Sequence, residues 1–164
     1  MSQPTEEVLR LLEDDARLGA AEIAERTGLA PAQVEALVKS LQEQGVIRRY
    51  KAVVNWERLG VEHVFAFIEV KVAPQRGQGF DAVAERIMKF PEVHSLYLMS
   101  GTYDLHVVVE GKDMKEIAYF VAEKLAPLDN VISTATHFVL KRYKVDGDVI
   151  EDGEKQSERL SISP

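Results

Sequence analysis

Between Ala20 and Val54, apolar residues recur at helical spacing on both sides of a short turn, and this feature limits the possible fold more than any other. Ile23 and Ala24 belong to a short helix that ends at Thr27-Gly28-Leu29. Pro31 begins a second helix, because its fixed φ suits the first helical turn. The buried stripe of that helix comprises Val34, Leu37, Val38 and Leu41. The pattern predicts a helix-turn-helix.

A β-prone run follows the second helix. Gly45 ends that helix, since glycine takes the left-handed conformation at a helix end without strain. A further amphipathic helix, which begins near Thr5, precedes the helix-turn-helix. Residues 46–54 are then predicted to form a strand. The run carries three cations, Arg48, Arg49 and Lys51. Three helices followed by a basic strand, or wing, predict a winged helix-turn-helix that binds double-stranded DNA.

The charge of the chain is acidic overall but unevenly distributed. Its formal net charge is −7, of which −4 falls in residues 146–164. Around the expected wing, Glu57 is the only acid among the cations at 48, 49, 51 and 58. Because phosphate binding depends on local charge, the net value does not exclude a DNA partner. The acidic tail, 146–164, lacks an apolar period and is expected to be disordered or a loose surface arm, with residues 159–164 as a weak candidate for an edge strand.

The second half of the chain alternates strand and helix patterns. Strands are predicted over 64–72, 93–99, 105–109 and 131–141, with helices over 80–89 and 114–125. This β-α-β-β-α-β order is the ferredoxin-like pattern, an antiparallel sheet with both helices on one face. The predicted fold class is α+β, with a winged helix-turn-helix domain at 1–60 and a ferredoxin-like domain at 61–145.

The first of these strands has two different faces. Its helix-facing side comprises Val64, Ala66, Ile68, Val70 and Val72. Phe65 and Phe67 point the other way, and Phe138 belongs to the corresponding set on the last strand. Because aromatic residues on the uncovered side of a sheet favour a second covering, we expect the sheet of another subunit to pack there.

Several other classes of protein fit the sequence poorly. The 164 residues include no cysteine, which excludes disulfides and thiolate metal sites and makes the cytoplasm the expected location. No apolar run approaches the ~20 residues of a membrane helix. His63, His94, His106 and His137 have no metal-ligand spacing, and His106 and His137 fall on strands that the topology separates. With no nucleophile or phosphate-binding motif, we expect neither an enzyme nor a bound metal or cofactor.

Residues 5–145 resemble the Lrp/AsnC family of transcriptional regulators. The similarity is carried by the helix-turn-helix with Gly45-Val46-Ile47, by Leu59-Gly60, by Ser100-Gly101-Thr102-Tyr103-Asp104-Leu105 and by Ser133-Thr134-Ala135-Thr136. The resemblance implies a regulator that responds to a small effector, commonly an amino acid. It also implies a homodimer with sheets packed face to face, assembled further into octamers or other higher oligomers.

The family's effector site maps onto two segments of this sequence. The matching residues are Gly101, Thr102, Tyr103, Asp104, Thr134 and Thr136. Backbone N–H groups of a glycine-containing turn suit a carboxylate, and Asp104 suits an ammonium group. A Gly-x-x-Asp sequence between strands is also an ordinary hairpin turn, so both interpretations stay open.

The recognition helix departs from the family pattern. Family members usually have Ser before this helix and Arg at two positions along it, where this chain has Ala30, Leu37 and Ser40. The expected DNA contacts are Ala32, Gln33, Ala36, Lys39 and Ser40, together with Arg48, Arg49 and Lys51 of the wing. Gln33 could read adenine and Lys39 a phosphate.

Two alternatives have the same two-domain pattern. One is an enzyme similar to the siroheme decarboxylases, although the second domain lacks the cluster of His and Arg that an anionic tetrapyrrole requires. The other is an effector-binding module that has lost DNA binding, which the loss of two arginines from the recognition helix would suit.

Overall fold

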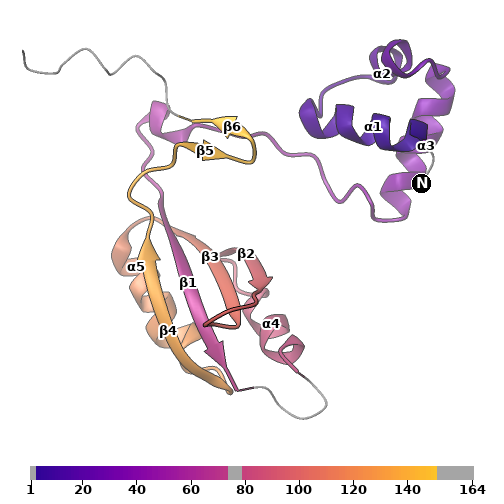
Figure 1. Cartoon of the computed structure of the whole chain (residues 1–164). Coiled ribbons are helices and arrows are strands. Elements are labelled where there is room, and N and C mark those ends of the chain that lie inside the picture. Colours follow the sequence, from indigo (N-terminus) through magenta and orange to yellow (C-terminus); the bar gives the residue numbers. More distant parts are fainter. Residues whose placement is uncertain (1–2, 74–78, 151–164) are drawn as a thin grey trace, which may run out of the picture. The chain divides into compact units, whose positions relative to one another are not determined.

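The computed structural model describes residues 3–73 and 79–150. Its contacts divide the chain into two compact units, Met1–Val54 and Asn55–Pro164. This division falls before the expected domain boundary after Gly60. Figure 1 shows the three helices of the first unit and the sheet of the second.

The first unit is a bundle of three helices, as predicted. They are α1 (Gln3–Asp14), α2 (Ala20–Thr27) and α3 (Pro31–Glu43). One side of each helix is apolar, and the buried residues pack into a small core of Val8, Ile23, Ala24 and Val34. Gly28 ends α2 with φ of 71°, the left-handed conformation that the turn requires.

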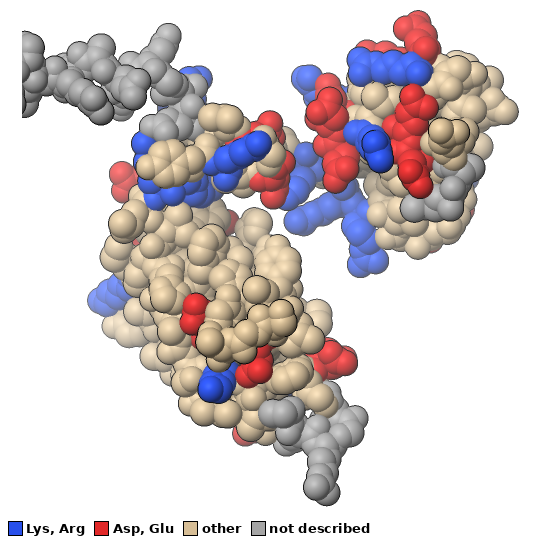
Figure 2. Space-filling view, in the orientation of Figure 1, with Lys and Arg blue, Asp and Glu red and all other residues tan. Residues whose placement is uncertain are grey.

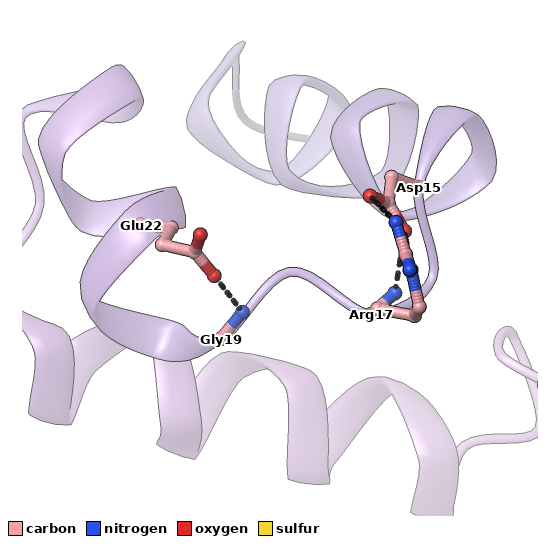
Figure 3. A network of polar contacts seen from close by, with 4 residues as sticks. All are labelled: Asp15, Arg17, Gly19 and Glu22. Carbon is pink, nitrogen blue, oxygen red and sulfur yellow. Dashed lines mark hydrogen bonds and ion pairs between the residues drawn. The ribbon is translucent and has the colours of Figure 1, made fainter.

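Short-range polar contacts fix the connection between α1 and α2 (Figure 3). The backbone N–H of Gly19 donates to Oε2 of Glu22 at 2.8 Å, which satisfies one free donor at the start of α2. The Asp15 carboxylate accepts from the backbone N–H of Arg17 at 2.9 Å and from its guanidinium at 3.2 Å. These hydrogen bonds from Arg17 hold the pKa of Asp15 below its ordinary value.

The start of α3 also has free backbone N–H groups, but its N-cap residue, Ala30, has no side chain that could accept from them. The N–H of Ala30 itself donates to Oε1 of Gln33 at 2.9 Å. Half of a capping box is therefore present. The side chain expected to read adenine is engaged in holding the helix start.

The prediction of a wing strand over residues 46–54 is wrong. Residues 46–54 contain neither helix nor strand, and a 3-10 helix, η1 (Trp56–Leu59), follows them. The backbone N–H groups of Val46 and Ile47 both donate to the carbonyl of Leu41, at 2.9 and 3.1 Å. A β-prone sequence forms a strand only where another strand pairs with it, and none does so within this described segment.

The second unit contains the predicted ferredoxin-like arrangement. Its elements are β1 (Val64–Val72), α4 (Asp81–Ile87), β2 (Val93–Leu98), β3 (Leu105–Gly111), α5 (Met114–Phe120) and β4 (Val131–Phe138). The strands pair antiparallel in the order β2-β3-β1-β4, with both helices on one side (Figure 1). The helix expected over 114–125 continues beyond α5 as a π-helical turn, Val121–Leu125.

The core lies between the sheet and its two helices. Ala66, Ile68, Val70 and Val72 of β1 are buried there, as predicted, and Val64 is partly buried. Phe138 was expected on the opposite face, and that expectation is wrong. It pairs with Ala66 and packs against the core, because directly opposed residues of paired strands share a face.

A small hairpin follows the sheet, in a region expected to be a loose arm. β5 (Lys144–Val145) pairs with β6 (Asp148–Val149) across a turn in which Asp146 and Gly147 have φ of 50° and 96°. Ile150 is 8% exposed, and its carbonyl accepts from Nδ2 of Asn55 at 2.9 Å. The expectation of disorder is therefore wrong for residues 146–150. The remainder of the tail, including the candidate edge strand at 159–164, lies outside the described residues.

Candidate functional site

The predicted contact face of α3 lies on the outside of the first unit. Ala32, Gln33, Ala36 and Lys39 are exposed, and Ser40 is half-buried. Lys39 lies 4.0 Å from a carboxylate oxygen of Glu43, and the Ser40 hydroxyl accepts from Nε2 of Gln44 at 2.8 Å. With Gln33 at the helix start, the three polar side chains of this face all have partners inside the protein.

Basic side chains gather along the segment that follows α3 (Figure 2). Arg48, Arg49 and Lys51 are exposed there. Within the part of the chain that the structure describes, neither Arg48 nor Arg49 has an ion-pair or hydrogen-bond partner. Their guanidinium groups are therefore available to an anionic partner such as the DNA backbone.

The loop before β3 contains four of the six predicted effector residues and is held firmly by Asp104. The N–H of Asp104 donates to the carbonyl of Val70 at 3.0 Å, and its own carbonyl accepts from the N–H of Met99 at 2.8 Å. Oδ2 of Asp104 accepts from the N–H of Val72 at 2.8 Å. Gly101 has φ of 148°, which side chains rarely adopt. One Asp104 oxygen thus holds the loop, and no protein donor to the other is recorded among the described residues.

The two predicted threonines approach this loop from the far side of β1. Thr134 pairs with Val70, whose other neighbour is Leu105, the residue after Asp104. Two strand spacings separate the neighbours of a central strand, about 10 Å. Thr136 lies further along, opposite the buried Ile68. Because they pair with residues of the helix-covered face, both threonines lie on that face.

Tyr103 belongs to the opposite side. Its hydroxyl lies 3.4 Å from Nδ1 of His106, which pairs with Glu69 on the face away from the helices. The structure therefore brings the loop and Thr134 to one end of the sheet but does not line a single pocket with all six residues. A surface pocket lined by Glu92, Lys112, Tyr119 and Lys124, among others, contains none of them; no motif in the sequence indicated it.

The uncovered face of the sheet, which we call the open face, is rich in aromatic and histidine side chains. Cross-strand pairing assigns to it Phe65, Phe67, Glu69, Tyr97, His106, Val108, Ala135 and His137. Phe67 is 42% and Tyr97 is 53% exposed. The rings of Phe67 and His106 have centroids 5.3 Å apart. This is the surface that the sequence predicted to be covered by another subunit.

Two other kinds of feature are absent from the described residues: a metal site and a membrane-spanning helix. No group of three or more His, Asp or Glu side chains in residues 3–73 and 79–150 is arranged to hold a metal ion. His106 and His137 lie on β3 and β4 with β1 between them, as predicted. Within the same ranges, no helix is long and apolar enough to span a membrane.

Comparison with known proteins identifies both units. Residues 65–149 match the Lrp/AsnC ligand binding domain, and residues 1–48 match a winged helix-turn-helix DNA-binding domain. The uncharacterized HTH-type transcriptional regulator YugG of Bacillus subtilis is 45% identical over 100% of this chain and 99% of its own. The chain belongs to the Lrp/AsnC family of transcriptional regulators.

Other members of the Lrp/AsnC family agree with this assignment. The HTH-type transcriptional regulator FL11 of Pyrococcus furiosus is 34% identical over 84% of this chain and 87% of its own. The structure of the Neisseria meningitidis transcriptional regulator NMB0573 in complex with L-Met superposes with a TM-score of 0.71 at 27% identity, covering 88% of this chain and 93% of that one. These relatives are named as regulators. The matches support a DNA-binding unit joined to a ligand-binding unit.

Proposed function

We propose that this protein binds double-stranded DNA as a homodimer and that an amino acid bound near Asp104 changes its DNA binding. The observation that carries the proposal is the pair of exposed arginines, Arg48 and Arg49, directly after the helix-turn-helix, for which the described residues provide no partner. An exposed cation without a protein partner can neutralise a phosphate without first breaking an ion pair.

In the proposed complex, the N-terminal part of α3 lies in the major groove. Ala32 and Ala36 are small enough for close approach to thymine methyl groups, and Lys39 can leave its distant partner Glu43 for a phosphate. Gln33 contributes to base contact only if it gives up its hydrogen bond to Ala30. In a two-fold dimer, the two copies of α3 would contact major grooves about 34–36 Å apart.

The dimer in this proposal forms through the open face. Phe67, Tyr97 and Val108 offer apolar surface, whereas the opposite face of the sheet is already covered by α4 and α5. A two-fold axis would place each Phe67 against an aromatic surface of the partner. Higher oligomers would then form between dimers.

The proposed effector is an amino acid, because the loop provides complementary groups for both of its charges. Backbone N–H groups at the exposed Gly101 and Thr102 suit the carboxylate, and Oδ1 of Asp104 suits the ammonium group. The L-Met complex of the 27% identical Neisseria regulator supports this ligand class. To act as an effector, the amino acid must bind one DNA-binding assembly more tightly than another.

The test combines ligand screening with DNA binding. Each of the common amino acids is added to the purified protein, thermal unfolding is monitored, and any stabilising amino acid is then tested for its effect on oligomer size and on affinity for genomic fragments enriched by the protein. The proposal expects at least one amino acid to change both quantities. If no amino acid changes either one, the effector part of the proposal is wrong.

The dimer is tested separately. Phe67→Glu should convert the dimer into a monomer of 18.4 kDa in sedimentation velocity, because it places a charge on the open face. Met114→Glu changes another exposed apolar residue, at the start of α5, and should leave the dimer intact. A dimeric Phe67→Glu protein would contradict the proposed interface.

A further inference from the structure

Residues 46–54, which we call the basic arm, form a single chain that no strand of the described residues pairs with, and two sets of hydrogen bonds attach it to α3. At its start, Val46 and Ile47 donate to the carbonyl of Leu41, at 2.9 and 3.1 Å. Further along, Nε2 of Gln42 donates to the Tyr50 hydroxyl at 3.3 Å. Arg48 and Arg49 lie between these attachments, so they are held close to the C-terminal end of α3.

The arginines of the basic arm are available to a DNA partner, whereas the polar residues of α3 are already engaged within the protein. Gln33, Lys39 and Ser40 each contact another residue of the first unit. Arg48 and Arg49 are exposed, and the structure records no partner for either in the described residues. Of these residues, the strongest donors that are available to DNA are therefore on the arm rather than on α3.

We propose that the basic arm enters the minor groove of A·T-rich DNA through Arg48 and Arg49. This inference rests on the proposed DNA-binding function and adds the groove and the base composition that are recognised. A single chain that carries arginine side chains fits a minor groove of about 6 Å. A·T-rich minor grooves are narrow and strongly negative, which attracts the guanidinium group.

The attachment to α3 puts the arm in the right place for this contact. When the N-terminal residues of a recognition helix contact base edges, its C-terminal end lies towards the rim of the major groove. The adjacent minor groove begins across the phosphate backbone from that rim. An arm held at Leu41 and Gln42 therefore reaches the backbone first and the minor groove directly beyond it.

The experiment compares three duplexes of equal length that contain only A·T, only I·C or only G·C pairs. Inosine is guanine without its 2-amino group, so an I·C pair presents the minor-groove pattern of A·T and the major-groove pattern of G·C. Fluorescence anisotropy with the full-length protein should give affinities for A·T and I·C that agree within about twofold, both about tenfold or more above that for G·C.

Two variants separate groove binding from general attraction to phosphate. Arg48→Lys with Arg49→Lys keeps the charge, so the salt dependence should stay the same while the preference over G·C falls below about threefold. Lys39→Ala is the matched control on α3; it should weaken binding to all three duplexes and keep the preference. Circular dichroism checks that both variants fold, which their exposed positions favour.

The possible outcomes are distinct. Equal binding to I·C and G·C would overturn the minor-groove proposal, whether A·T binds better or all three duplexes bind alike. The first result would indicate readout in the major groove, and the second would indicate phosphate contacts alone. If no duplex binds even at low salt, the proposed function itself is wrong, and the arm proposal fails with it.

Discussion

Asp104 accepts a hydrogen bond from the backbone N–H of Val72 at 2.8 Å, where the ladder between β1 and β3 ends. β3 begins at Leu105, opposite Val70, and provides no backbone acceptor for Val72. The Asp104 side chain supplies that acceptor. The residue expected to hold an effector is therefore also part of the fold, through its Oδ2 atom.

Replacing Asp104 should affect stability and ligand binding to different extents. Asp104→Ala leaves the Val72 N–H unpaired and should lower the free energy of unfolding by about 1–3 kcal/mol. Asp104→Asn keeps an acceptor and should cost less, but it should weaken amino-acid binding as much as Asp104→Ala, because the charge is lost. Urea unfolding and calorimetric titration measure the two effects.

Thr102→Ala is the control for Asp104, since Thr102 is exposed and has no recorded partner in the described chain. It should leave the unfolding free energy unchanged within about 0.5 kcal/mol. Equal stability of wild type and Asp104→Ala would show that the Val72 hydrogen bond contributes nothing.

One substitution at the start of α3 should make this helix more stable. Ala30→Ser adds the missing side-chain acceptor and should stabilise α3 by about 0.5–2 kcal/mol, because Ser bonds a free N–H in the first turn. Gln33→Ala should do the reverse, since it frees the N–H of Ala30. Amide hydrogen exchange within α3 reports both changes, and faster exchange in Ala30→Ser would contradict the capping geometry.

The ion pair between Glu92 and Lys124 should make stability depend on pH. Burial disfavours the charged form of Glu92, but hydrogen bonds from Lys124 and from its own backbone N–H outweigh this and lower the pKa of Glu92 from 4.5. The resulting stability is fully present above that value and is lost as pH falls through the lowered pKa. Lys124→Met should cost about 0.2–1 kcal/mol at neutral pH.

The difference between wild type and Lys124→Met should disappear in acid, once Glu92 is protonated. Arg86→Met is the control, because it removes an ion pair with Asp129 in which the side chains are 54% and 80% exposed. Its effect should be undetectable in thermal unfolding at either pH. A loss in Lys124→Met that persists unchanged in acid would rule out the ion pair as its cause.

The hairpin after β4 should contribute to the stability of the second unit through Ile150. Ile150→Ala removes a side chain that is 8% exposed and should cost about 2–4 kcal/mol in urea unfolding. Val149→Ala changes a neighbouring side chain that is 73% exposed and should have little effect. Similar stability of the two variants would mean that Ile150 is not part of the packed structure.

Sequence patterns predicted the fold best where successive side chains alternate between the core and the opposite face of the sheet. The alternation of β1 identified both faces correctly, since burial of Ala66, Ile68 and Val70 requires a period of two. Phe138 was assigned to the wrong face because the register of β4 depends on its pairing with β1, which shifts between Lys71 and Val72. A single sequence contains no direct signal for that shift.

The two other errors have different causes. Residues 46–54 have strand propensity, but propensity does not supply a partner strand. The β5–β6 hairpin did have a signal, because Asp146-Gly147 is typical of the two-residue hairpin turn. It was missed because strands of two residues, Lys144–Val145 and Asp148–Val149, show no periodicity.

The candidate site was also predicted only in part from the sequence. The resemblance to the Lrp/AsnC family implied that Asp104 and Thr134 belong to one effector site, and the structure brings both to the end of β1 near Val70. It could not show that Gln33 is engaged at the start of α3 or that Asp104 holds Val72, because both contacts depend on backbone geometry.

The most direct test of the account is the affinity of the protein for duplex DNA as a function of salt concentration. Phosphate contacts release counterions, so the logarithm of the binding constant should fall steeply and linearly with the logarithm of salt concentration. Arg48→Ala with Arg49→Ala should reduce that slope by about 2, one unit for each lost contact. The same slope in wild type and double variant, or no binding at low salt, would contradict the central claim.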